Sequence, residues 1–401
     1  MKGKIVLISV LLSILWLPVM AQNQGVSDPV REFAVGGSVD STSVAVMVLD
    51  LKTGRTTGSY RADAPMVPAS VMKCVTTATL LKQVGHDWRY ETPVYITGRV
   101  RARKLEGNLV VEGSADPSVN SRQDLSPDII PEIIAALRRH DIDSIMGAIV
   151  VDESRFKGEA INPGWAQGDL SQAYGTGTHA FNFEDNASGS ASVRDPGAVF
   201  RSRLTSALSR AGIAVGSTPL PDGRRTLITV HKSATVDEIM RSCMMRSDNQ
   251  YAESMLRTVS RNAGKDGSVA AGADFVMNYW KSRRIPADSV RIVDGSGLSR
   301  SNRLTARFLA QLLRKMATNH YYASFFPLAG HDGTLRKFLA GTRLDGYVAL
   351  KTGSMNGIQS YAGYKLDDNF EPTHVIVVMV NNMADRARAR AGIQKMLEAL
   401  F

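Results

Sequence analysis

Cysteine and histidine are scarce in this chain. It contains two cysteines, Cys74 and Cys243, and seven histidines among 401 residues. A disulfide between the cysteines is possible in an oxidising compartment, but we expect both to be buried free thiols. Neither is expected to act as a nucleophile, because no histidine is placed to serve it. The histidines also lack the paired spacing of a metal site, so we expect no metal and no cofactor.

Long apolar runs are absent beyond the N-terminus. Lys2 and Lys4 precede an apolar run over residues 5–18, and residues 19–21 resemble a cleavage site. This pattern predicts a secretory signal peptide over residues 1–21, with an uncleaved anchor as the alternative. The run is shorter than the ~20 residues that span a bilayer, and it has no cysteine to carry a lipid. We therefore expect an exported, soluble protein without a stable membrane anchor.

Runs of like charge, internal repeats and long low-complexity segments are also absent. The net charge is +10, but the basic residues are scattered. Scattered charge argues against a nucleic-acid partner, whereas a diffuse positive surface would suit an anionic polymer such as a cell wall. A composition of 44% hydrophobic and 21% charged residues is that of a globular protein. The length exceeds that of one ordinary domain.

The pattern of strands and turns divides the chain. Residues 41–50 are typical of a strand, residues 52–54 of a turn and residues 55–61 of the returning strand. From about residue 90 to residue 234, short strands and turns alternate with two helices, which predicts an inserted α+β module. We expect its strands at residues 91–100, 108–113, 144–151 and 226–231, and its helices at residues 131–139 and 198–211.

Helices dominate from residue 236 onwards, and strands return near the end of the chain. We expect helices at residues 236–245, 249–262, 267–283, 305–318 and 384–400, and strands at residues 346–353, 358–365 and 373–381. Strands at both ends of the chain, with helices between them, predict a sheet with helices packed on its faces. The expected fold class is therefore α+β.

The first candidate motif is Ser70-Val71-Met72-Lys73. Pro68 suits a first helical turn, and apolar residues recur at helical spacing over residues 71–81, which predicts a helix with one apolar stripe. On that helix the serine and the lysine share a face, so the amine can activate the hydroxyl as a nucleophile. The lysine accepts the proton only when neutral, so its pKa must fall from about 10.4 through burial or a second cation.

The same four-residue pattern occurs at Ser154 and Lys157. There the serine follows a strand-like run, and Gly158 comes directly after the lysine. No helix is indicated, so these two side chains need not meet. Helical context favours Ser70.

The second candidate motif is Ser247-Asp248-Asn249, which follows a predicted helix. Its serine hydroxyl can relay a proton, and its asparagine amide can hold a peptide carbonyl. On a loop, residues two apart can both face a cleft. The alternative is capping of the next helix by Ser247 or Asp248.

The third candidate motif is Lys351-Thr352-Gly353, in a predicted strand near the C-terminus. Lys351 can attract a substrate carboxylate and lower the pKa of Lys73, and Thr352 can donate a hydrogen bond to that carboxylate. Gly353 would let a ligand backbone lie against the strand edge. The backbone N–H groups of Ser70 and Ser354 can then form an oxyanion hole.

The order of these motifs, each in its expected context, is the signature of penicillin-binding proteins and serine β-lactamases. From about Asp40 to its C-terminus, the chain resembles the class C low-molecular-mass penicillin-binding proteins, the D-Ala-D-Ala carboxypeptidase/endopeptidase family. Five further segments carry the resemblance, namely Gly113–Ser118, Val151–Phe156, Asp294–Arg300, Gly330–Leu335 and Tyr361–Tyr364.

The resemblance implies a discontinuous catalytic domain over residues 22–89 and 235–401, with the penicillin-binding/β-lactamase-like transpeptidase fold. Residues 90–234 would then be an inserted, smaller α+β accessory domain. The gap between the first two motifs is shorter than in the larger family members. We infer that a second accessory domain is reduced or missing near residues 186–193.

The resemblance also implies a serine peptidase acting on peptidoglycan stem peptides and inhibited by β-lactams. Its catalytic residues would be Ser70, Lys73, Ser247, Asn249 and Lys351, and its substrate-binding residues Thr352, Gly353, Ser354, Asp169, Tyr174, Arg300 and Met355. Of the substrate-binding residues, Thr352, Gly353 and Ser354 would contact the D-Ala terminus and the acyl group. The last four match a side pocket that holds the zwitterionic end of meso-diaminopimelate. Export and the absence of an anchor then place the protein in the periplasm.

Two other functions remain open at this point. A β-lactamase needs a deacylating base, and Glu253 is the only glutamate between Asn249 and Lys351. It lacks the Glu-x-x-x-Asn setting of class A enzymes, because Arg257 stands four residues on. A non-enzymatic wall-binding or β-lactam-sensing module is the second possibility. The sequence leaves open the balance of carboxypeptidase and endopeptidase action, the wall-enzyme partners and the oligomeric state.

Overall fold

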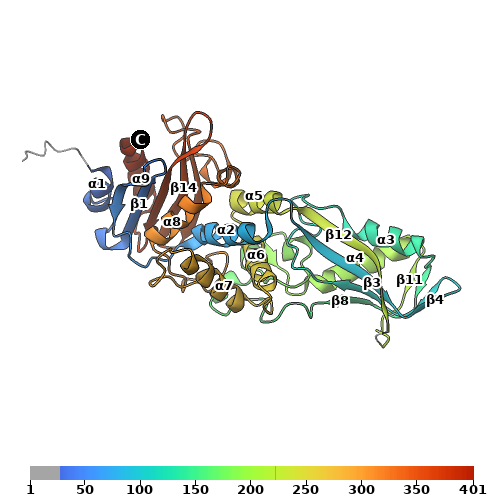
Figure 1. The fold of residues 1–401 in the computed structure, drawn as a ribbon. Coiled ribbons are helices and arrows are strands. Elements are labelled where there is room, and N and C mark those ends of the chain that lie inside the picture. Colours follow the sequence, from blue (N-terminus) through green and yellow to red (C-terminus); the bar gives the residue numbers. More distant parts are fainter. Residues whose placement is uncertain (1–27, 222) are drawn as a thin grey trace, which may run out of the picture.

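The computed structural model describes residues 28–221 and 223–401. The signal peptide predicted over residues 1–21 therefore lies outside the described residues. The molecule is elongated, with a five-stranded sheet towards one end and smaller sheets at the other (Figure 1).

The larger sheet brings together strands from both ends of the chain. It contains β1 (Val44–Asp50), β2 (Thr56–Tyr60), β13 (Val348–Met355), β14 (Ile358–Leu366) and β15 (Pro372–Val380). Their order is β13-β14-β15-β1-β2, and all neighbours are antiparallel. The third motif thus lies in β13 at the edge of the sheet, as predicted.

Strand β1 shows why both faces of this sheet are covered. Val44, Val46 and Val48 point into a core shared with α1 (Pro29–Val35) and α9 (Arg386–Leu400). The alternate residues of β1 point into a second core that includes residues of α8 (Ala306–Met316). Because successive side chains of a strand face opposite sides, an apolar run such as this one serves two cores at once.

The part of the molecule that contains the five-stranded sheet is the larger of the two, and we call it the larger half. Helix α2 (Met72–Val84) lies at its centre (Figure 1). It packs among α8 and the helices α5 (Val236–Arg246), α6 (Asn249–Asn262) and α7 (Val269–Ser282). Every residue over the range 72–81 is buried. The residues at the predicted apolar spacing are thus buried, and the polar residues between them are buried as well, because this part of the helix is enclosed on all sides.

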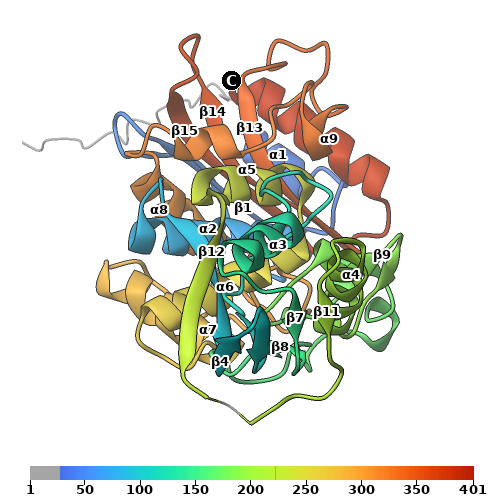
Figure 2. The same ribbon diagram turned by 90° about the vertical axis from the view of Figure 1, so that its right-hand side faces the viewer.

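The other half of the molecule is built around two four-stranded sheets (Figure 2). In order, the first contains β12 (Arg225–Thr235), β3 (Arg89–Thr97), β6 (Leu109–Glu112) and β8 (Ile149–Asp152). The second contains β11 (Ala214–Val215), β7 (Ser144–Ile145), β5 (Lys104–Glu106) and β4 (Arg99–Arg101). Helices α3 (Ile129–Arg139) and α4 (Pro196–Arg210) contribute to the separate core of this half, which includes Phe181, Phe183 and Phe200.

The chain leaves and re-enters the larger half at one place. Strands β3 and β12 are antiparallel neighbours, and Arg89 pairs with Thr235. This arrangement supports an insertion over residues 90–234, although the domain boundaries stay a prediction. Where a second accessory domain was expected to be reduced, β9 (Ala187–Ser188) and β10 (Ala191–Ser192) form only a two-stranded hairpin.

The predicted single strand over residues 144–151 is wrong. The segment forms β7 and β8, which belong to different sheets. Between them, Gly147 lies against the backbone of Gly107, where an added Cβ would come within 2.5 Å of the carbonyl oxygen. The chain crosses from one sheet to the other at this close approach. The predicted strand over residues 91–100 likewise divides into β3 and β4, which belong to different sheets. Helix α1 and the short strands β5, β9, β10 and β11 were not predicted, and the remaining helices and strands lie within a few residues of their predicted ranges.

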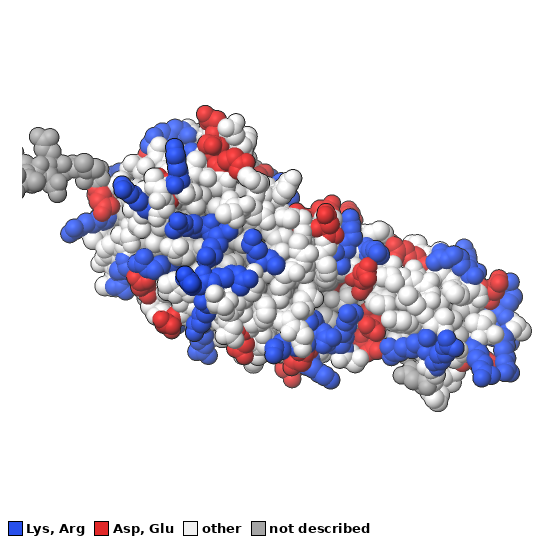
Figure 3. Space-filling model, in the orientation of Figure 1, with Lys and Arg blue, Asp and Glu red and all other residues white. Residues whose placement is uncertain are grey.

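The surface carries charges of both signs along its length. Lys and Arg side chains lie at both ends of the face shown in Figure 3, with Asp and Glu side chains among them. Within residues 28–221 and 223–401, no helix has both the length and the apolarity needed to cross a membrane.

Candidate active site

Ser70 lies in a tight turn at the entrance to helix α2. It belongs to a 3₁₀ turn, Ala69–Val71, and the α-helix itself begins only at Met72. Ala69 has a positive φ of 50°, a left-handed conformation that residues other than glycine seldom adopt. The turn places the Ser70 Oγ 3.0 Å from the Lys73 Nζ. The first motif is therefore brought together, although through a sharper turn than a regular helix start.

The amine of Lys73 is completely buried and held by three oxygen atoms. Besides the Ser70 hydroxyl, it donates to the Asn249 Oδ1 at 2.6 Å and to the Ser296 backbone oxygen at 2.9 Å. Burial lowers the pKa of Lys73, because an ammonium ion loses its hydration there. The nearby carboxylates of Asp248, Asp294 and Glu253 oppose this shift. The burial expected for a lysine base is thus present.

A second lysine and serine face each other in the same region. The Lys351 Nζ lies 2.8 Å from the Ser247 Oγ, and it also donates to its neighbour's carbonyl oxygen, that of Thr352. Burial, followed by the charge of Lys73, lowers the pKa of Lys351 to about 7. Each amine therefore lies beside its own serine hydroxyl.

The second motif lies in the corner between α5 and α6. Ser247 has a positive φ of 61° and ends α5, whereas Asn249 is the first residue of α6. Asp248 caps α6 by accepting a hydrogen bond from the Tyr251 N–H at 3.1 Å. The capping alternative thus describes Asp248, and the same corner directs Ser247 and Asn249 to the two lysines.

Gly353 lies against the nucleophile turn. A Cβ on this glycine would come within 2.7 Å of the Pro68 carbonyl oxygen and 3.1 Å of the Ser70 nitrogen. The space that was expected to admit a ligand backbone is filled by the turn itself. The residues on either side of Gly353 form hydrogen bonds with other side chains. The Thr352 hydroxyl bonds the Thr334 hydroxyl at 2.8 Å, and the Ser354 hydroxyl donates to the Gln359 Oε1 at 3.0 Å.

The close packing of Gly353 gives a testable prediction. We expect Gly353→Ala to reduce the rate of acylation by benzylpenicillin about 100-fold, because a shift of about 1 Å at a reacting group costs that much. Gly168→Ala is the matched control, since a Cβ there meets nothing within 4 Å. Stopped-flow experiments, or mass spectrometry of samples quenched at set times, would measure the acylation rate of each variant. Equal rates in both variants would contradict the proposed packing constraint.

The predicted side-pocket residues make hydrogen bonds within two segments of the chain. The Asp169 carboxylate accepts a hydrogen bond from the Tyr174 hydroxyl at 2.9 Å, which raises the pKa of Tyr174. Arg300 donates to the Asn356 carbonyl oxygen at 2.6 Å, next to Met355. Among the described residues, no hydrogen bond or ion pair joins Asp169 to Arg300. The segment of Tyr174 touches the second motif through a 2.8 Å hydrogen bond from the Asn249 amide to the Tyr174 carbonyl oxygen.

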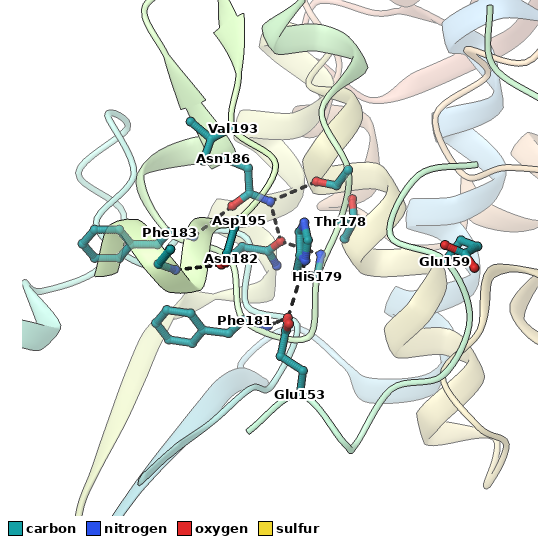
Figure 4. A network of polar contacts seen from close by, with 12 residues as sticks. Glu153, Glu159, Thr178, His179, Phe181, Asn182, Phe183, Asn186, Val193 and Asp195 are labelled. Carbon is teal, nitrogen blue, oxygen red and sulfur yellow. Dashed lines mark hydrogen bonds and ion pairs between the residues drawn. The ribbon is translucent and has the colours of Figure 1, made fainter. Parts of the chain in front are cut away.

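A polar network fixes the segment that follows Tyr174 (Figure 4). The Asn186 Nδ2 donates to the Asn182 Oδ1 at 2.8 Å, and Asn182 in turn donates to the Ser254 hydroxyl of α6 at 3.3 Å. His179 lies 3.6 Å from Glu153 in the same network. The segment is thus tied to the helix that begins with Asn249, which supports a fixed position for Tyr174 beside the lysines.

The two cysteines take no part in this chemistry. Cys74 and Cys243 are both free and buried, which confirms the expected thiols and excludes a disulfide between them in this structure. Burial raises the pKa of each thiol to about 12, so both remain protonated and unreactive near neutral pH.

One loop of the site had no predicted role. The carbonyl oxygen of Ser296 holds Lys73, and Gly297 lies so close to the nucleophile turn that a Cβ would come within 1.9 Å of the Ala69 oxygen. The Gly-Ser-Gly sequence at residues 295–297 was visible as part of the family resemblance. The glycine spacing was the available signal, because such residues permit close backbone approach.

Residues 27–189 and 184–400 match the D-Ala-D-Ala carboxypeptidase 3 (S13) family. This chain belongs to that family. The match confirms the resemblance inferred from the three motifs. Carboxypeptidase Rv3627c of Mycobacterium tuberculosis is 28% identical over 353 residues, which cover 83% of this chain and 75% of the relative.

Solved structures show the same fold. Penicillin-binding protein 4 (dacB) of Haemophilus influenzae superposes with a TM-score of 0.80 at 22% identity, covering 92% of this chain and 98% of that chain. The penicillin G-acylated predatory endopeptidase Bd3459 of Bdellovibrio bacteriovorus gives 0.55 at 19% identity, covering 88% and 90%. The S13-family chain described here therefore has the predicted α+β, β-lactamase-like architecture.

Proposed function

We propose that this S13-family protein is a serine D-Ala-D-Ala carboxypeptidase and D,D-endopeptidase that acts on peptidoglycan peptides through an acyl-enzyme on Ser70. The observation that carries the proposal is the 3.0 Å contact between the Ser70 hydroxyl and the fully buried amine of Lys73. A lysine whose pKa is lowered by burial can serve as a general base near neutral pH.

Acylation would proceed by one proton transfer and one exchange of bonds. Neutral Lys73 takes the proton of Ser70 as the Oγ bonds to the carbonyl carbon of the D-Ala-D-Ala amide. The N–H groups of Ser70 and Ser354 stabilise the oxyanion. The C–N bond then breaks, and the departing D-alanine amine receives a proton through Ser247, whose hydroxyl lies 2.8 Å from the Lys351 Nζ. Water subsequently hydrolyses the acyl-enzyme.

The remaining residues would bind the substrate. Lys351 and Thr352 attract its terminal carboxylate, and Asn249 holds its amide. Asp169, Tyr174, Arg300 and Met355 would form the side pocket for a zwitterionic diamino-acid end, with a negative group for the amine and a positive group for the carboxylate. The bond between Asn249 and Tyr174 supports the placement of one part of this pocket beside the reacting centre.

The cellular setting follows from the substrate. Stem peptides of the wall lie outside the cytoplasm, and the apolar N-terminal run predicts export, so we propose a periplasmic location. β-Lactams resemble the D-Ala-D-Ala terminus and would acylate Ser70 in the same way. The penicillin G-acylated state of a relative with this fold supports that expectation.

Digestion of purified muropeptides would test the activity. We expect release of D-alanine from pentapeptide monomers and conversion of cross-linked dimers to monomers, both followed by chromatography and mass spectrometry. Prior treatment with benzylpenicillin is the control and should block both reactions. Intact pentapeptides and dimers after prolonged incubation would contradict the proposal and favour a binding or sensing module.

A β-lactamase activity is less well supported. The Glu253 carboxylate accepts hydrogen bonds from the N–H groups of Gly295 and Ser296 at 2.8–3.1 Å, so it is already engaged by the backbone. A deacylating base must instead hold a water against the acyl group. Rapid, sustained hydrolysis of nitrocefin would reverse this assignment, whereas a single-turnover burst agrees with it.

A further inference from the structure

A loop between helices α2 and α6 connects the catalytic lysine to a buried carboxylate. Its residue Ser296 offers a carbonyl oxygen to the Lys73 Nζ at 2.9 Å, and the neighbouring Gly295 carbonyl oxygen accepts the Thr76 hydroxyl of α2 at 2.7 Å. On the other side, Glu253 of α6 receives the N–H groups of the same two loop residues. The loop is therefore clamped between the two helices.

The Glu253 side chain has the geometry of an anion built into the fold. It is 2% exposed, and three N–H···O contacts of 2.8–3.1 Å from two backbone N–H groups converge on its carboxylate oxygens. The two backbone N–H groups donate hydrogen bonds, and this favours the ionised form of the carboxylate. Burial and the neighbouring Asp294 act in the opposite direction and raise the pKa of Glu253 to about 7. Above that pH the carboxylate is ionised.

We propose that Glu253 is a positioning residue for catalysis, which fixes the Ser296 carbonyl oxygen against Lys73 and stabilises the ammonium ion formed when Lys73 accepts the proton of Ser70. Glu253 takes no proton itself in this step. The proposal rests on the assignment of Lys73 as the general base. It gives a catalytic use to a glutamate that otherwise has no place in the mechanism.

The sign of the pH effect follows from the charges around Lys73. The titratable groups whose charges act on this amine are Lys351 on β13, Cys243 on α5, Asp248 at the N-cap of α6, Glu253 on α6 and Asp294 in the loop. The negative charge of Glu253 raises the pKa of Lys73 and so opposes the effect of burial. Without that charge Lys73 becomes a weaker base, and it becomes neutral at lower pH.

Glu253→Gln tests this inference, because the amide keeps the size of the side chain and removes its charge. We expect the plateau rate of acylation by benzylpenicillin to fall about tenfold, as a weaker base accepts the proton less readily. We also expect the acid limb of the pH–rate profile to move to lower pH. A merely structural role would lower the plateau and leave the acid limb in place, and that result would overturn the proposal.

Two controls make the test specific. Asp288→Asn removes the same charge from an exposed position and should leave plateau and acid limb unchanged. If Glu253→Gln does not fold, Thr76→Val loosens the same loop from helix α2, and an unchanged acylation rate in that variant would overturn the proposal. Failure of the wild type to be acylated on Ser70 would instead refute the proposed function. A wild-type profile in Glu253→Gln would refute only the role of Glu253.

Discussion

Ser70→Ala should reduce the release of D-alanine from a pentapeptide by roughly 10⁴-fold or more, and it should abolish the covalent adduct with penicillin. The reason is that no other hydroxyl in the described site can replace the one held 3.0 Å from the Lys73 amine. Ser247 bonds the second lysine and is proposed to relay a proton rather than attack. Coupled assays of free D-alanine and intact-protein mass spectrometry would measure the two effects.

The chain supplies its own matched control for this experiment. Ser154 begins the same four-residue pattern with Lys157, but it is exposed and lies in a turn after β8. Ser154→Ala should therefore retain wild-type rates of D-alanine release and acylation. Loss of activity in Ser154→Ala, or a surviving penicillin adduct in Ser70→Ala, would contradict the assignment of the nucleophile.

Lys73→Met should slow acylation by about 10³-fold, the usual contribution of a well-placed general base. Methionine fits a buried position and has no amine that must be desolvated, so we expect the variant to fold. Binding of the intact β-lactam should change much less than the acylation step, since Lys73 is proposed to act on the proton of Ser70. Rapid-mixing measurements over a range of β-lactam concentrations would separate the binding constant from the rate of acylation.

Lys82→Met provides the comparison for that variant. Lys82 lies on the same helix, in its last turn, but its side chain is exposed. Its replacement should leave the acylation rate unchanged. A rate for Lys73→Met close to that of Lys82→Met would show that another group accepts the proton.

Local patterns predicted most elements of the fold. The strand at β1, its return at β2 and the helices α5 to α8 follow from apolar spacing and turn residues, which act over a few positions along the chain. The family relation needed more than these patterns, namely the order of three motifs. Their order could be read because each motif is short and contiguous.

Features set by contacts between distant segments could not be predicted. The enclosure of α2 depends on helices more than 150 residues later in the chain, so the burial of its polar residues could not be predicted from local spacing. The role of Gly353 depends on its distance from Pro68, and that of Glu253 on its distance from Gly295. Sequence spacing contains none of these distances.

Peptide mapping of the wild-type protein after reaction with benzylpenicillin would identify the acylated residue. We expect one adduct per chain, on the peptide that contains Ser70, formed at a rate that rises with pH as Lys73 loses its proton. An adduct on any other residue, or none after long incubation with the folded protein, would show that the paired serine and lysine at the start of α2 are not the reacting centre.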